Sequence, residues 1–189
     1  MLKGKTLFLI LLAISLKYIK IDKIEKIHIV TENTSSNYNR YNSITYEKND
    51  EINTEYIAHL KIPKINLYKG LVDINSMDNY VDKNIQIING SNMPDIKNSN
   101  LILAAHSGNS NVSFFKELNQ LEINDSIYIE YNNKNYEYKM VNYYIVEKTG
   151  YIDIIRNENI NTLTLITCIE NTNKQLVIIC EIYKITNLW

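Results

Sequence analysis

Two residues of this sequence, Cys168 and His106, are the strongest candidates for chemistry. Cys168 ends the apolar run 162–168 and leads into Ile-Glu-Asn-Thr-Asn-Lys, so its thiol is expected at the end of a strand. His106 likewise ends the apolar run 100–106 and enters a Ser-Gly-Asn-Ser loop. A cation beside a thiol favours the thiolate, which is the nucleophile of cysteine enzymes. Catalysis by this pair competes with a plainer interpretation, a buried cysteine and a surface histidine.

The other cysteine and the other two histidines are weaker candidates for catalysis. Cys180 lies in the middle of an apolar strand and is expected to be a small buried hydrophobe. His28 is close to the N-terminal apolar segment, and His59 lies in an alternating strand, so a cysteine–histidine pair must use His106. Two cysteines exclude a disulfide-rich scaffold, and no His, Cys and Asp cluster has the spacing of metal ligands. We expect neither a metal nor another cofactor.

Short β-rich runs position these residues. Apolar and alternating segments occur at 57–67, 100–106, 126–131, 135–146, 162–168 and 175–183. Residues 132–134 are expected to form a hairpin turn, and Ser113 is expected to cap a helical turn with apolar positions at Phe114, Phe115, Leu118 and Leu121. This pattern predicts a mostly β fold, a closed or nearly closed barrel of seven or eight strands with one or two short helices.

The N-terminus differs from the rest of the chain. Residues 6–16 are an apolar run between lysines, and with Lys17 and Lys20 snorkelling the segment approaches the length that a membrane span requires. No small-x-small cleavage site follows, which favours an uncleaved signal-anchor over a signal peptide; a buried helix of the domain is the alternative. We expect an anchor at 1–30, a polar linker at 31–55 and the barrel at 56–189. Lysines on both sides leave the orientation open.

Composition limits the kinds of partner. The 189 residues include 20 Lys and Arg against 21 Asp and Glu, a net charge of −1, so nothing attracts the chain as a whole to nucleic acid. A hydrophobic share of 45% is enough for a folded core. Only two arginines occur, Arg40 and Arg156.

The segments Leu-Ile-Leu-Ala-Ala-His106-Ser-Gly and Thr-Leu-Thr-Leu-Ile-Thr-Cys168 resemble the two signature segments of sortases, the cysteine transpeptidases of Gram-positive bacterial surfaces. Their order agrees, since His106 precedes Cys168 by 62 residues with a hairpin between them. Ile-Pro-Lys-Ile at 62–65 is similar to the opening strand of the family. The resemblance covers about residues 56–185, and it departs mildly where Ala105 replaces a common glycine.

The resemblance implies a reaction. A sorting signal of the Leu-Pro-x-Thr-Gly kind on a secreted protein is attacked by the Cys168 thiolate, and His106 protonates the leaving amine. A cell-wall precursor or a pilin lysine then resolves the thioacyl-enzyme, outside a membrane that the N-terminal helix crosses once. Because only about 15 residues separate 146 from 162, and no Asp-Pro-aromatic lid is present, a compact class A-like or class D-like enzyme is implied. Calcium dependence stays open.

One expected residue is missing. Sortases carry an arginine near the start of the strand after the cysteine, where it holds the substrate and the developing oxyanion. Here Gln175 best matches that position, with Lys174 beside it, and alternation allows only one of the two to share the cleft of Cys168. An amide donates hydrogen bonds without charge, and a lysine brings charge without a bidentate fork. Arg156 is expected at the far end of the strand.

Two other functions are alternatives to the transpeptidase. The missing arginine motivates a degenerate, non-catalytic sortase-like barrel that binds surface peptides. A membrane-anchored cysteine peptidase of another fold is disfavoured, because papain-like enzymes set their cysteine on a helix ahead of the histidine, and the order here is reversed.

Overall fold

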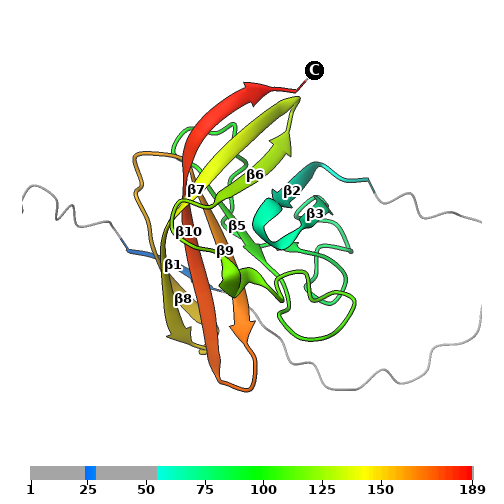
Figure 1. Ribbon diagram of the computed structural model, residues 1–189, viewed down its shortest axis with the longest axis vertical. Helices are drawn as coiled ribbons and strands as arrows, with labels where there is room; N and C mark the ends of the chain where they lie inside the picture. Colours follow the sequence, from blue (N-terminus) through cyan, green and yellow to red (C-terminus); the bar gives the residue numbers. More distant parts are fainter. Residues whose placement is uncertain (1–23, 29–54, 189) are drawn as a thin grey trace, which may run out of the picture.

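Strands dominate the computed structural model of the chain, which describes residues 24–28 and 55–188 (Figure 1). Within these ranges there are two short 3₁₀ helices, η1 (Pro63–Ile65) and η2 (Leu118–Gln120). The strands are β1 (Ile24–His28), β2 (Ala58–Ile62), β3 (Leu67–Leu71), β4 (Gln86–Ile87), β5 (Asn100–Ala104), β6 (Ser126–Tyr131), β7 (Lys134–Glu147), β8 (Tyr151–Ile155), β9 (Thr162–Ile169) and β10 (Lys174–Asn187).

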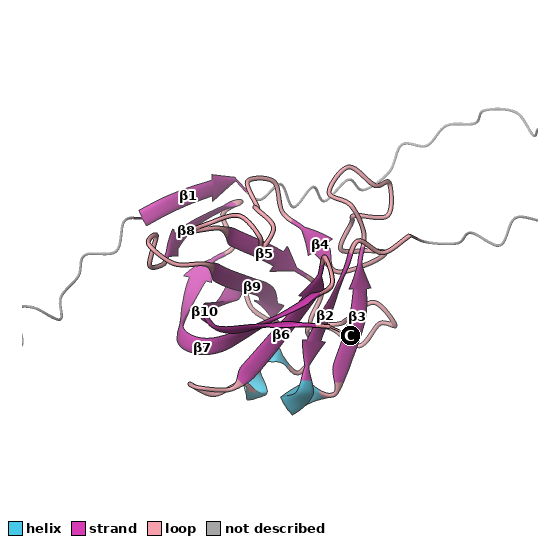
Figure 2. Ribbon diagram, turned by 90° about the horizontal axis from the view of Figure 1, so that it is seen from above, coloured by secondary structure: helices cyan, strands magenta, loops and turns pink. Residues whose placement is uncertain are grey.

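Eight of the strands form one sheet in the order β3-β2-β6-β7-β10-β9-β5-β4, which curls into a nearly closed barrel (Figures 1 and 2). All pairs are antiparallel except β5 with β9, which run parallel. The prediction of a mostly β barrel of seven or eight strands with few helices is therefore confirmed. The predicted anchor run 6–16 lies outside the described residues, and the described part of the chain contains no helix long and apolar enough to span a membrane.

The central strands are buried on both faces. Leu163 and Leu165 of β9 point into the main core of the barrel, whereas Ile166 packs on the opposite face in a second apolar cluster. That second cluster includes Ile152 and Ile154 of β8, which are almost fully buried. A strand covered on both faces has a continuous apolar run instead of an alternating one, as the sequence of β9 does.

The hairpin predicted between 126–131 and 135–146 is confirmed as β6 and β7. Its turn consists of Asn132 and Asn133, whose φ angles are 49° and 57°. A two-residue turn with both residues at positive φ is the type I′ turn that matches the twist of paired strands, and asparagine tolerates this conformation well.

The alternating run 57–67 contains β2, η1 and the first residue of β3, because Pro63 starts a 3₁₀ turn directly after β2 and Asn66 adopts a left-handed φ of 52°. The helical turn predicted at 113–121 was wrong in detail. The segment 113–121 contains turns and the single 3₁₀ turn η2. The Ser113 hydroxyl does not cap a helix there but accepts a hydrogen bond from the backbone N–H of Ser110 at 3.1 Å. A 3₁₀ turn is the usual form for so short a segment.

A small second sheet lies beside the barrel. Strand β1 pairs antiparallel with β8 over five residues, from Ile24 opposite Ile155 to His28 opposite Tyr151, on the side away from β2 and β3 (Figure 2). Residues 24–28 belong to the segment that the sequence assigned to the anchor. Their backbone thus connects the N-terminal part of the chain to the strand that covers the second apolar cluster.

This pairing predicts a local effect of truncation. Deleting residues 1–30 removes the strand that β8 pairs with, whereas deleting residues 1–23 keeps it. We expect backbone amides of β8 to exchange with solvent about tenfold faster in the protein that lacks residues 1–30 than in the one that lacks residues 1–23. This corresponds to a change of about 1.4 kcal/mol in local stability. Hydrogen exchange followed by mass spectrometry measures this, with β6 as an internal control. Equal exchange of β8 in the two proteins would contradict the pairing.

Candidate active site at the barrel rim

Cys168 stands between two neighbouring chain segments at one end of the sheet. On one side, Gln175 of β10 is its direct antiparallel partner. On the other side, Ala104 pairs with Ile166 in parallel register, and the N–H of Ala105 donates to the carbonyl of Ile166 at 3.3 Å. Strand β5 ends at Ala104, so His106 lies two residues beyond the paired register, in the loop that starts beside the end of β9. Paired residues on adjacent strands share a face of the sheet, so Gln175 lies on the face of Cys168.

The end of β9 is held in place by a side chain. The Thr167 hydroxyl donates a 2.8 Å hydrogen bond to the carbonyl of Ala105, the residue before His106. Thr167 is buried, so this bond is protected from water. This bond connects the end of the strand that carries Cys168 to the start of the loop that carries His106.

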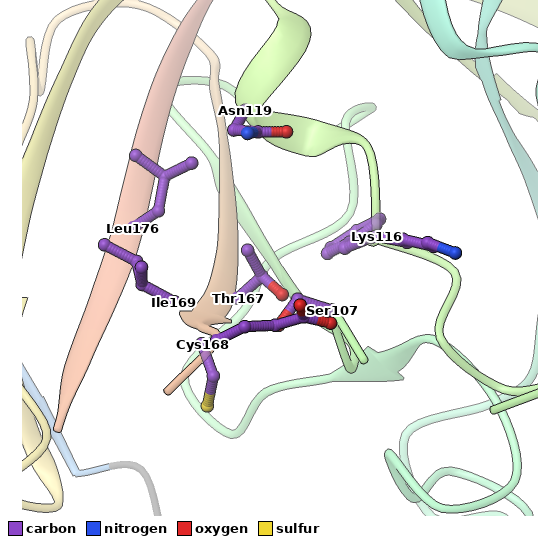
Figure 3. Close-up of a pocket in the computed structure, with 9 residues that line it drawn as sticks. Ser107, Lys116, Asn119, Thr167, Cys168, Ile169 and Leu176 are labelled. Carbon is purple, nitrogen blue, oxygen red and sulfur yellow. The ribbon is translucent and has the colours of Figure 1, made fainter. Parts of the chain in front are cut away.

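Beside Cys168 the surface is hollowed by a cavity of about 270 Å³. It is lined by Ser107, Phe115, Lys116, Asn119, Thr167, Cys168, Ile169, Glu170 and Leu176. Figure 3 shows the Cys168 sulfur pointing away from Asn119 and Leu176. The residues that line the cavity include Cys168 but neither His106 nor Gln175.

His106 has a partner that the sequence did not indicate. Its Nε2 lies 2.7 Å from Oδ1 of Asp82, and the two side chains are 40% and 85% exposed. The carbonyl of His106 accepts from the N–H of Phe115 at 3.0 Å, which fixes the backbone of the histidine. Asp82 lies 24 residues earlier in the loop between β3 and β4. No local motif marks an aspartate at such a separation.

The three residues that could take the place of the missing arginine lie in different positions relative to Cys168. Gln175 is only 4% exposed and lies on the face of Cys168. Lys174 points to the opposite face, and its Nζ is 3.9 Å from Oε1 of Glu147. Arg156 donates to the carbonyl of Asn98 at 3.4 Å, ahead of β5 and so at the end of the sheet away from Cys168.

The second cysteine has a different environment. Cys180 is fully buried in the main core, and burial raises the pKa of its thiol. A buried thiol of raised pKa is a poor nucleophile. Among the described residues, no group of three or more His, Cys, Asp and Glu side chains is arranged to hold a metal ion.

Comparison with known proteins adds the following. The family model of the sortase domain matches residues 60–183, whereas no curated protein matches the chain. Among solved structures, sortase A of Listeria monocytogenes is 20% identical, covers 71% of this chain and 91% of its own, and has a TM-score of 0.59. Sortase C of Streptococcus pneumoniae is 20% identical over 69% of this chain and 70% of its own, with a TM-score of 0.59. The sortase D5 transpeptidase of Clostridium perfringens is 21% identical over 69% and 80%, with a TM-score of 0.57. At these identities the solved structures establish the fold.

Proposed function

Because this chain belongs to the sortase family, we propose that it is a cysteine transpeptidase that cleaves a C-terminal sorting signal of the Leu-Pro-x-Thr-Gly kind. The surface protein is then transferred through a thioacyl-enzyme to an amine of the cell wall. The observation that carries the proposal is that Cys168 has Gln175 as its direct partner on β10, while the loop that carries His106 is hydrogen-bonded to the other edge of β9 through Ala105. A nucleophile, a proton donor and a hydrogen-bond donor at one rim are what acyl transfer needs.

The first half of the reaction forms a thioester. The Cys168 sulfur attacks the threonine carbonyl carbon, a C–S bond forms, and the carbonyl oxygen becomes an oxyanion. The threonine–glycine C–N bond then breaks, and His106, as the imidazolium, gives its proton to the leaving amine. The second half reverses these roles: the acceptor amine attacks the thioester, its proton passes to His106, and the Cys168 thiolate leaves.

Gln175 is assigned to the oxyanion. Its side-chain amide donates hydrogen bonds but carries no charge. The position favours a neutral group, because Gln175 is 4% exposed and has Val146 and Cys168 as its neighbours on the flanking strands. An unpaired charge is costly in such surroundings. The resulting enzyme is slower than one with an arginine at this place.

The cellular setting follows from the same proposal. The apolar run 6–16 serves as a single membrane anchor, and the barrel lies outside the cell. Its partners are secreted proteins with a sorting signal and the amine of a peptidoglycan precursor or of a pilin lysine. The chemistry calls for no cofactor.

The test is direct detection of the intermediate. The full chain is incubated with a library of sorting-signal peptides, and intact-mass and peptide mass spectrometry look for a thioester on Cys168. Adding a glycine-based amine should then release a new amide product. Loss of the signal peptide with no amide product, in excess amine, would indicate a protease instead.

The non-catalytic barrel remains the second candidate, because an amide stands where the family has an arginine. It predicts that a library peptide binds at the rim without any thioester. The same mass spectrometry, together with a binding measurement on Cys168→Ala, separates the two.

A further inference from the structure

The loop that carries Asp82 is a firmly held piece of structure. Buried Asn79 donates from its side-chain amide to the carbonyls of Ile74 and Ile87 and accepts from the N–H of Ile87 at 2.7 Å. A turn then brings the N–H groups of Lys83 and Asn84 to the carbonyl of Tyr80, at 2.9 and 2.7 Å. Asp82 lies inside that turn. Its exposed carboxylate is therefore presented to His106 from a fixed backbone.

The backbone of His106 is fixed as well, through the hydrogen bonds of Ala105 and of the His106 carbonyl. What remains free is the rotation of the imidazole and the choice of its protonated nitrogen. An ionised carboxylate only accepts hydrogen bonds, so Asp82 requires a proton on Nε2. Nδ1 is then left for the reacting groups, as an acceptor in the neutral ring and as a donor in the imidazolium.

We propose that Asp82 is a positioning residue for His106: its carboxylate holds Nε2–H, and this fixes Nδ1 as the nitrogen that exchanges protons with the substrate amine. The role rests on the proposed transpeptidase function. Other charged groups at the rim occupy different places: Lys116 and Glu170 line the cavity beside Cys168, and Lys83 pairs with Asp78 at 2.8 Å.

The loop supplies a matched control. Asp78→Ala removes an exposed carboxylate of the same charge from the same loop, but one that pairs with Lys83 instead of His106. We expect Asp82→Ala to lower kcat about fivefold with little change in KM, because an exposed pair contributes modestly. Asp78→Ala should leave both unchanged. Asp82→Asn keeps an acceptor oxygen and should recover part of the lost kcat.

A second readout does not depend on turnover. Nitrogen-15 NMR of the histidine side chains reports the tautomer of His106, assigned with His106→Asn. The full chain and Asp78→Ala should show the proton on Nε2, and Asp82→Ala should show a mixture of tautomers. If the full chain forms no thioester, the proposed function fails while the NMR result still decides the contact. If Asp82→Ala matches Asp78→Ala in kcat or keeps the Nε2 tautomer unchanged, the positioning role is overturned.

Discussion

Cys168→Ala is expected to abolish thioester formation with a sorting-signal peptide, whereas Cys180→Ala forms the thioester at a rate close to that of the unchanged chain. The difference follows from position. Cys168 lines a cavity at the barrel rim and is partly exposed. The Cys180 thiol is fully buried in the main core, and its raised pKa keeps it protonated at neutral pH.

The measurement is intact-mass spectrometry after a peptide pulse, followed by digestion that places the added mass on one cysteine. Cys180→Ala leaves a small cavity in the core, so its melting temperature is recorded alongside its activity. A thioester found on Cys180, or one that persists in Cys168→Ala, would show that the nucleophile has been misassigned.

Much of the rim was predictable because strand ends leave a local signature. Apolar runs that change abruptly to polar loops located Cys168 and His106, and the two-residue period of a strand separated Gln175 from Lys174. The length of β9 likewise put Arg156 at the other end of the sheet. Each of these inferences uses residues that are neighbours in sequence or lie on one strand.

The parts that were missed depend on long-range contacts. Strand β8 is five residues long and pairs with β1, more than 120 residues earlier. The sequence of neither segment indicates which strand it pairs with. Asp82 reaches His106 from a separate loop for the same reason. In the run 57–67, the alternation continues past Pro63, although the chain turns back there through η1 and the left-handed Asn66.

Gln175→Arg tests whether weak stabilisation of the oxyanion limits the rate of thioester formation. An arginine offers charged donors in a planar fork, and removing one oxyanion donor from an enzyme costs about 10²–10³ in turnover. Converting a neutral donor into a charged one should regain part of this factor, so we expect thioester formation to accelerate about tenfold or more. Gln175 is the second residue of β10, at the rim, so the longer side chain can carry its guanidinium to the edge of the site.

The strand itself provides the control. Lys174→Arg places the same side chain one residue earlier, on the opposite face beside Glu147, and should not accelerate the reaction. Gln175→Leu removes the donor at nearly constant size and should slow thioester formation further. If Gln175→Arg and Lys174→Arg behave alike while Arg156→Ala abolishes activity, then Arg156 holds the oxyanion in spite of its distant position. Faster thioester formation confined to Gln175→Arg would instead assign the oxyanion site to the residue directly opposite Cys168, since only that position shares its face.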